Sequence, residues 1–179
     1  TREGGLFRVH TSTGEHRARR VVLAMGRRGA PRRLGVSGEE LDKVFYDIVE
    51  MEAFEGRRVL VVGGGDSAVE SAVGLANQAG TEVMLAYRAD EFSRIKDRSR
   101  AKIERAIAEG RVRMMFRTVV REIRPDVVLL SVDGEPAIAP NDDVVIRIGG
   151  DAPHAFLEKL GVRIVQKDVP VAPAAAKAG

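Results

Sequence analysis

A short apolar run that ends in three glycines constrains this chain more than any other feature. Val59–Val62 is rich in β-branched residues and predicts a buried strand. The small-residue pattern from Asp66 to Ala79 predicts a helix, with Gly80 as its C-terminal glycine. A strand that passes into a helix through the bare turn Gly63–Gly65 is typical of a sheet with helical crossovers, so the fold is expected to be built around this unit.

The chain beyond this unit continues the alternation of strands and helices. The expected elements are strands at Val83–Ala86 and Val112–Phe116, a helix over Arg98–Glu109 ended by Gly110, antiparallel strands between residues 118 and 140, and a last buried strand at Asp142–Gly150. This order predicts an α/β fold, a Rossmann-like parallel sheet with crossover helices and a small antiparallel β-meander.

The flanking segments carry weaker patterns. Leu6–Thr11 alternates and predicts a strand before a turn at Thr13-Gly14, and the continuous apolar run Val21–Met25 predicts a second, buried strand. A helical pattern covers Glu39–Phe54, and a short helix is expected in "HAFLEKLGV" before an alanine- and proline-rich tail. The expected domains are residues 1–26, 27–150 and 151–179.

Composition excludes several classes of site. The 179 residues include no cysteine, which excludes disulfides, thiolate metal ligands and thiol redox couples within this chain, and the three histidines are too scattered to predict a metal site. No apolar run approaches the ~20 residues that span a bilayer. We therefore expect a cytoplasmic setting without a membrane partner. With few aromatic residues, the chain lacks the pattern of a single-strand binder, and its net charge of +3 fits an anionic small ligand as well as it fits nucleic acid.

The glycine turn matches a nucleotide-binding pattern. "GGGDSA" fits G-x-G-x-x-A, with Gly63, Gly65 and Ala68 at the three required positions. The first glycine permits a tight exit from the strand, the second lets a pyrophosphate approach the main chain, and the alanine lets the helix pack close to the strand. The first N–H groups of the helix would then face the phosphates. Without its strand and helix context, the same pattern indicates only a tight turn.

Three polar residues near the turn have two interpretations each. Asp66 would repel a phosphate, so we expect it to be the N-cap of the helix. Ser67 would donate to a phosphate oxygen or share the cap. Glu70 would contact a ribose or the nicotinamide, or would be an early acid that the helix dipole favours.

The end of the second strand discriminates between dinucleotides. A free ribose 2′-hydroxyl usually meets an acid roughly 20 residues after the glycines, whereas this chain has Arg88, with Arg94 and Lys96 close behind. Cations at this place favour a 2′-phosphate, and so NADPH in preference to NADH. The alternative is a solvated basic helix face.

These motifs together resemble the NADPH-binding domain of thioredoxin-reductase-like flavoproteins. "VLVVGGGDSAVESA" is similar to the NADPH glycine motif of that family, and "VVLAMG" to the strand with which the chain leaves the FAD domain. "YRADEFSRIK" resembles the H-R-R-D-x-F-R-A segment, with Tyr87 in place of the histidine and Arg88 at the first arginine. Ala89 and Ser93 replace the other two arginines, and Arg94 and Lys96 are placed to compensate.

The resemblance also indicates a branch within the family. Its best match puts Asp47 and Glu50 where thioredoxin reductases have their two redox cysteines, so the chain is more similar to cysteine-free ferredoxin–NADP reductases and bacillithiol-reductase-like proteins. "DDVVIRIGGDAPHAFLEKLGV" resembles the closing strand of the NADPH domain. Gly149–Ala152 is also similar to the second FAD motif, although the closing strand is the better match.

The resemblance implies an NADP(H)-binding domain that delivers hydride from NADPH to a flavin held elsewhere. FAD would belong to the intact protein and to a partner FAD-binding domain, with an unknown electron acceptor. The residues expected at the cofactor are Gly63, Gly64, Gly65, Asp66, Ser67, Ala68, Tyr87, Arg88, Arg94, Lys96, Ile148, Gly149 and Gly150. None is expected to be catalytic.

Three other functions stay open from the sequence. The first is a stand-alone NAD(P)-binding sensor or regulatory module without turnover. The second is nucleic-acid binding through the basic segment Arg94–Arg105. The third is an S-adenosylmethionine-binding fold, which the arginines after the second strand disfavour. Because the chain begins with Thr1 and its glycine motif belongs to the nicotinamide side, we expect a piece of a longer protein.

Overall fold

The computed structural model describes residues 2–24, 31–150 and 154–163. The chain forms two compact units, Thr1–Arg28 with Ala152–Gly179, and Gly29–Asp151. In the first unit, β1 (Arg2–Glu3), β2 (Leu6–Thr11) and β3 (Gly14–Ala18) form an antiparallel sheet in that order. The same unit includes the short helix α3 (His154–Lys159).

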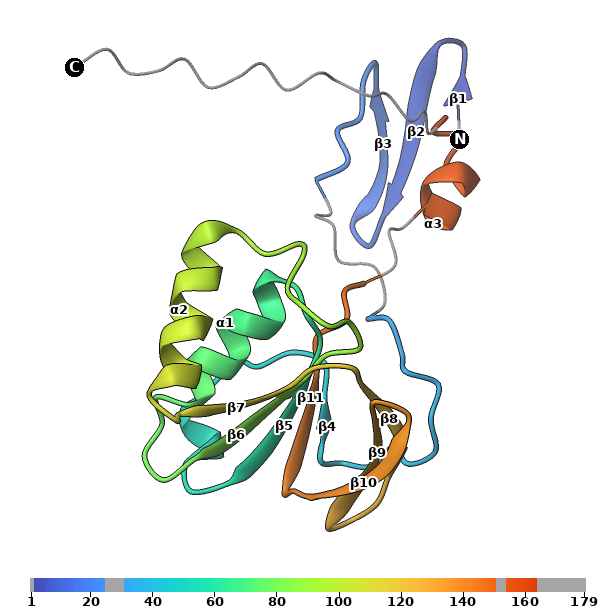
Figure 1. Ribbon diagram of the computed structural model, residues 1–179. Coiled ribbons are helices and arrows are strands. Elements are labelled where there is room, and N and C mark those ends of the chain that lie inside the picture. The colour runs from blue at the N-terminus through green and yellow to red at the C-terminus, as the bar shows by residue number, and fades with distance from the viewer. Residues whose placement is uncertain (1, 25–30, 151–153, 164–179) are drawn as a thin grey trace, which may run out of the picture. The chain divides into compact units, whose positions relative to one another are not determined.

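A five-stranded parallel sheet forms the centre of the second unit (Figure 1). Its strands are β4 (Val44–Phe45), β5 (Arg58–Val62), β6 (Glu82–Ala86), β7 (Val112–Met115) and β11 (Asp143–Ile146), in the order β4-β11-β5-β6-β7. The chain runs outward from β5 to β7 and then returns to add β11 on the other side of β5. The strand order therefore reverses between β5 and β11, which is where open α/β sheets bind ligands.

Two helices cover one face of this sheet. They are α1 (Asp66–Leu75) and α2 (Asp97–Ala108), and a short 3₁₀-helix η1 (Glu52–Phe54) precedes β5. Val59 and Val61 of β5 share a buried cluster with residues of both helices. Gly110, at φ +71°, ends α2 as expected, because its N–H donates to Ile107 and the N–H of Arg111 donates to Ala106.

An antiparallel meander covers the other face. Its strands are β8 (Thr118–Ile123), β9 (Val127–Val132) and β10 (Glu135–Pro140), in the order β10-β9-β8. Leu60 and Val62 of β5 share a second buried cluster with Val128 and Leu130 of β9. Helices, parallel sheet and meander form three layers (Figure 1), which explains why β5 is apolar on both faces. The predicted fold class, an α/β parallel sheet with a small meander, is confirmed.

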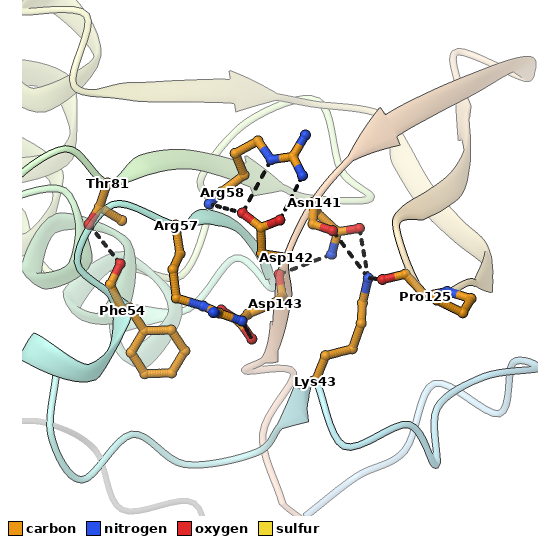
Figure 2. Close-up of polar contacts among 9 residues, drawn as sticks. All are labelled: Lys43, Phe54, Arg57, Arg58, Thr81, Pro125, Asn141, Asp142 and Asp143. Carbon is orange, nitrogen blue, oxygen red and sulfur yellow. Dashed lines mark hydrogen bonds and ion pairs between the residues drawn. The ribbon is translucent and has the colours of Figure 1, made fainter.

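Paired charges join the strands at their amino ends (Figure 2). Arg57 makes a bidentate ion pair with buried Asp143 of β11, and Arg58 pairs with Asp142 at 2.6 Å. Beside them, the Nζ of Lys43 donates to the carbonyl of Pro125 at 2.7 Å and to the Oδ1 of Asn141 at 3.1 Å. The arginine pairs link β5 to β11, and the Lys43 contacts link the start of β4 to Asn141 and to the loop that leaves β8.

The helix expected over Glu39–Phe54 is wrong. Gly38, at φ +82°, turns the chain tightly against Ile123, and β4 then pairs with β11. The buried carboxylate of Glu39 accepts hydrogen bonds from the N–H of Leu34 (2.7 Å), the N–H of Gly35 (2.8 Å) and the hydroxyl of Tyr46 (2.6 Å). Burial and the Glu39 contact raise the pKa of Tyr46 to about 12. These tertiary contacts override a weak local helical pattern.

Two other expectations are corrected. The helix α1 ends at Leu75 rather than Ala79, so Gly80, at φ +68°, closes a following turn and is not its C′ residue. No strand covers residues 21–24, where Val22 is 88% exposed, while Met25 lies outside the described residues. The strand that pairs with β2 is β3, Gly14–Ala18, which precedes the apolar run in the sequence.

The Arg58–Asp142 pair predicts a pH dependence of stability. The side chain and the backbone N–H of Arg58 lower the pKa of Asp142 from 3.8 to about 2. The carboxylate therefore stabilises the fold above about pH 4, and this contribution is lost as the pH falls toward 2. We expect Asp142→Asn to cost about 1 kcal/mol at neutral pH, because solvent screens a partly exposed pair, and much less near pH 2.

Urea unfolding from pH 7 down to about pH 2 measures this difference. The matched control is Glu135→Gln, which removes one exposed carboxylate from β10. The interpretation is wrong if the two substitutions change the pH dependence of the unfolding free energy equally.

Candidate functional site

The sequence motifs all follow the carboxyl ends of parallel strands. Gly63–Ala68 follow β5, Tyr87–Lys96 connect β6 to α2, and Ile148–Gly150 come after β11. Because parallel strands end at the same edge of a sheet, the structure brings these three segments to one edge. This edge includes the point where the strand order reverses.

Gly63 is required by the packing of α1 against the sheet. It lies at φ +149°, and a Cβ built there would be 2.4 Å from the carbonyl oxygen of Arg147 and 2.9 Å from the Cβ of Ala68. Ala68 itself is fully buried. A larger residue at either position would push α1 away from β5 and β11, which is the physical reason for the spacing.

The next two glycines differ in what surrounds them. A Cβ on Gly64 would be 2.1 Å from the ring of Tyr87, so this ring lies against the turn. A Cβ on Gly65 would meet no described atom within 4 Å, and its backbone is extended at φ −102°, ψ 176°. The turn is therefore packed at Gly63 and Gly64 and open at Gly65.

The N-terminus of α1, at Gly65, has no side-chain cap. Gly65 is the N-cap, its carbonyl accepts hydrogen bonds from the N–H groups of Ala68 and Val69, and no side chain caps the helix. The earlier amides of Asp66 and Ser67 precede the first intrahelical bonds. This arrangement of N–H groups and helix dipole can bind an anion.

The expectation that Asp66 caps α1 is wrong. Asp66 is the first helical residue, and its Oδ1 accepts a hydrogen bond from the N–H of Lys96 at 3.0 Å. The Ser99 hydroxyl, and after it the N–H of Lys96, lower the pKa of Asp66. Its carboxylate faces the start of α2, whereas the side chains of Ser67 and Glu70 are exposed.

The segment between β6 and α2 is fixed by aromatic packing. The ring of Tyr87 stacks on buried Phe92 at 5.9 Å between centroids, and Phe92 meets Phe116 edge-on at 5.2 Å. The N–H of Arg117 donates to the carbonyl of Ala89, and Arg100 donates to that of Phe92. Tyr87 therefore has a packing role, which the sequence motif alone did not indicate.

This segment presents cations to solvent. The side chains of Arg88, Arg94 and Lys96 are all exposed. Within residues 31–150, no hydrogen bond or ion pair engages the guanidinium of Arg88 or Arg94, while Lys96 attracts the carboxylate of Asp66. The ordered backbone thus carries charges that can bind an anionic group.

The segment after β11 is held by a neighbouring loop. The carbonyl of Gly149, which lies at φ +92°, accepts a hydrogen bond from the N–H of Arg32 at 3.1 Å, and Gly150 forms a bridge with Pro31. Ile148 packs on the second core cluster. These contacts hold the backbone after β11 in place at this edge of the sheet.

The sequence reasoning missed Arg147. Its Nε donates to Ser71 of α1 at 3.1 Å, and its Nη1 donates to the carbonyl of Tyr46 at 2.8 Å and to Asp47 at 2.9 Å. Asp47, which matches a cysteine position by resemblance, is thus in an ion pair, while Glu50 is exposed. The available signal was a single arginine within the otherwise apolar run 144–148.

Three further features of the described residues concern metal ligands, membrane spans and a recess away from the motifs. Among them, no group of three or more acidic or histidine side chains is placed to hold a metal ion, and no helix is long and apolar enough to cross a membrane. A recess of about 420 Å³ lies at the opposite edge of the sheet, lined in part by Arg58, Glu82 and Arg113. It includes none of the motif residues, so we place the candidate site by the glycine turn instead.

Two curated proteins that are similar to this chain in sequence are both named as reductases. The chain is 35% identical over 176 residues to a ferredoxin–NADP reductase of Ignicoccus hospitalis, which covers 94% of this chain and 56% of that relative. It is 33% identical over 164 residues to the bacilliredoxin reductase Bdr of Bacillus subtilis, covering 90% and 50%. The chain thus spans about half the length of the curated relatives it matches.

Solved structures agree with this grouping. The bacillithiol disulfide reductase Bdr from Staphylococcus aureus matches with a TM-score of 0.83 and 28% identity, over 93% of this chain and 52% of that one. A thioredoxin reductase from Lactococcus lactis matches with a TM-score of 0.76 and 27% identity, over 89% and 54%. The family described as pyridine nucleotide-disulphide oxidoreductase matches residues 1–176, and the chain therefore belongs to this family.

Proposed function

We propose that this chain is the NADP(H)-binding domain of a flavin-dependent oxidoreductase. The open N-terminus of α1 at Gly65, beside a fixed segment that presents three exposed cations, is the observation that carries the proposal. The names of the relatives, ferredoxin–NADP reductase among them, support it. The bound nicotinamide cofactor supplies a hydride, which a flavin held by another part of the protein accepts.

Each part of the cofactor has a candidate contact in this chain. The amides from Gly65 to Ala68 would hold the pyrophosphate, with Ser67 as a further donor. Arg88, Arg94 and Lys96 would bind the 2′-phosphate, which favours NADPH over NADH. The surface at Ile148–Gly150 would lie nearest the nicotinamide. In the intact protein, FAD and its binding domain would be the partners of this domain, and the electron acceptor stays unspecified.

Two alternatives are less well supported. Nucleic-acid binding through the basic helix is disfavoured because Arg105 pairs with Glu109 at 2.7 Å and Arg100 with Glu104 at 3.8 Å, which offsets charge along α2. A regulatory module without turnover is disfavoured because the relatives are named as reductases. Binding measurements with nucleotides and DNA distinguish the proposed function from nucleic-acid binding. Flavin reduction by the full-length protein distinguishes it from a regulatory module without turnover.

A titration with NADPH, NADH and a DNA duplex tests the proposal. We expect NADPH to bind at micromolar concentrations and at least about tenfold more tightly than NADH, since a 2′-phosphate adds charge-assisted hydrogen bonds. Calorimetry of each ligand provides the measurement. Binding of DNA with a steep salt dependence, together with no nucleotide binding below millimolar, would contradict it.

Arg88→Ala tests the assignment of the 2′-phosphate. The substitution should weaken NADPH binding about tenfold, as expected for the loss of one charge-assisted contact, and should change NADH binding less than about twofold. Arg121→Ala, on the exposed side of β8, is the control for loss of one positive charge. Equal losses for NADPH and NADH in the Arg88 variant would remove this residue from its role.

The glycine turn offers a matched pair of substitutions. Gly65→Ala adds a methyl group on the open side of an extended residue, so it should weaken both dinucleotides about tenfold with little change in melting temperature. Gly63→Ala would meet the Arg147 carbonyl and should destabilise the fold. Thermal unfolding and calorimetry distinguish the two, and unchanged binding by Gly65→Ala would argue against pyrophosphate at this turn.

A further inference from the structure

We propose that Asp66 is a positioning residue that sets the preference for a 2′-phosphorylated nucleotide. Its carboxylate joins the start of α1, at the glycine turn, to the end of the basic segment that enters α2. This inference rests on the proposed function. Asp66 is an acid beside a proposed phosphate site, and positioning of α2 is a reason for its presence there.

The contacts of Asp66 all lie at the start of α2. Its Oδ1 accepts a hydrogen bond from the backbone N–H of Lys96, thirty residues along the chain, at 3.0 Å, and the hydroxyl of buried Ser99 in α2 helps to lower the pKa of the carboxylate. Lys96 is the N-cap of α2, and its own side chain makes no capping bond. One carboxylate of α1 therefore fixes where α2 begins.

The other end of the basic segment is held by different contacts. The Tyr87 ring lies between Gly64 and Phe92, and the carbonyl of Ala89 accepts the N–H of Arg117 at 3.0 Å. From Ser93 onward, the segment is held by the burial of Ile95, by the bond from the Lys96 N–H to Asp66, and by the N–H groups of Ser99 and Arg100, which donate to the Lys96 carbonyl. Arg94 and Lys96 lie in this second part, and the bond to Asp66 is the hydrogen bond that ties their backbone to the start of α1.

The charge of Asp66 and its role as an acceptor are separable. A negative charge near an open helix N-terminus opposes any phosphate, but here two donors and the charge of Lys96 stabilise it. An asparagine would remove the charge while keeping an acceptor oxygen for the N–H of Lys96. An alanine would remove both. If positioning is the role, the acceptor matters for the 2′-phosphate, whereas the charge acts on every dinucleotide alike.

Calorimetric titration of the protein with NADPH and NADH tests this role. We expect Asp66→Ala to lower the ratio of NADPH to NADH affinity about tenfold, because the cations would have to be ordered on binding. Asp66→Asn should keep this ratio within about threefold of the unsubstituted protein. Adenosine 2′,5′-bisphosphate and AMP, titrated in parallel, should reproduce the same pattern without the nicotinamide half.

Three results would overturn the inference. One is an equal loss for both dinucleotides in Asp66→Ala, which a merely structural link between helices would give. Another is a fall in the ratio for Asp66→Asn as large as that for alanine. The third concerns Ser99→Ala, which removes the hydroxyl that helps to lower the pKa of Asp66 and should lower the ratio about threefold. An unchanged ratio there overturns the inference even if Asp66→Ala fails to fold.

Failure of the proposed function has a different signature. It would appear in the unsubstituted protein, as no binding of either dinucleotide or as equal affinity for both. A preference for NADPH in the unsubstituted protein that Asp66→Ala leaves intact would contradict only the role of Asp66.

Discussion

The close approach of Gly63 to its neighbours is the constraint on which the rest of the site depends. A side chain there would meet the carbonyl of Arg147 at 2.4 Å and the methyl of Ala68 at 2.9 Å. Only a bare backbone lets β5, β11 and the start of α1 come together. This contact brings the N-terminus of α1 to the point where the strand order reverses, and it leaves Gly65 as the residue with an open side.

The two edges of the parallel sheet carry charge in different ways. At the amino ends, Arg57 and Arg58 are paired with Asp143 and Asp142, so these charges stabilise the strand order. At the carboxyl ends, exposed cations follow β6 on a backbone that aromatic packing and hydrogen bonds hold in place. Binding an anion there would cost little reorganisation, because the segment is already ordered.

The position that resemblance assigns to a redox cysteine has another use in this chain. Asp47 pairs with Arg147, whose guanidinium also contacts Ser71 and the carbonyl of Tyr46. The arginine thus ties α1 and the segment after β4 to the end of β11. Since the chain has no cysteine, it cannot relay electrons through a dithiol, and this ion pair contributes packing and orientation instead.

The sequence by itself determined the α/β fold, the meander and the motif segments, because strand runs, glycine turns and helix periodicity are local patterns. Two examples of such local patterns are the end of α2 at Gly110 and the turn at Gly63–Ala68. Only the tertiary structure decided the partner of Asp66, the packing of Tyr87 on Gly64 and the role of Arg147. It also replaced the helix expected from Glu39 with a loop built on the buried carboxylate of that residue. Each of these depends on contacts between residues far apart in the chain, which no local pattern encodes.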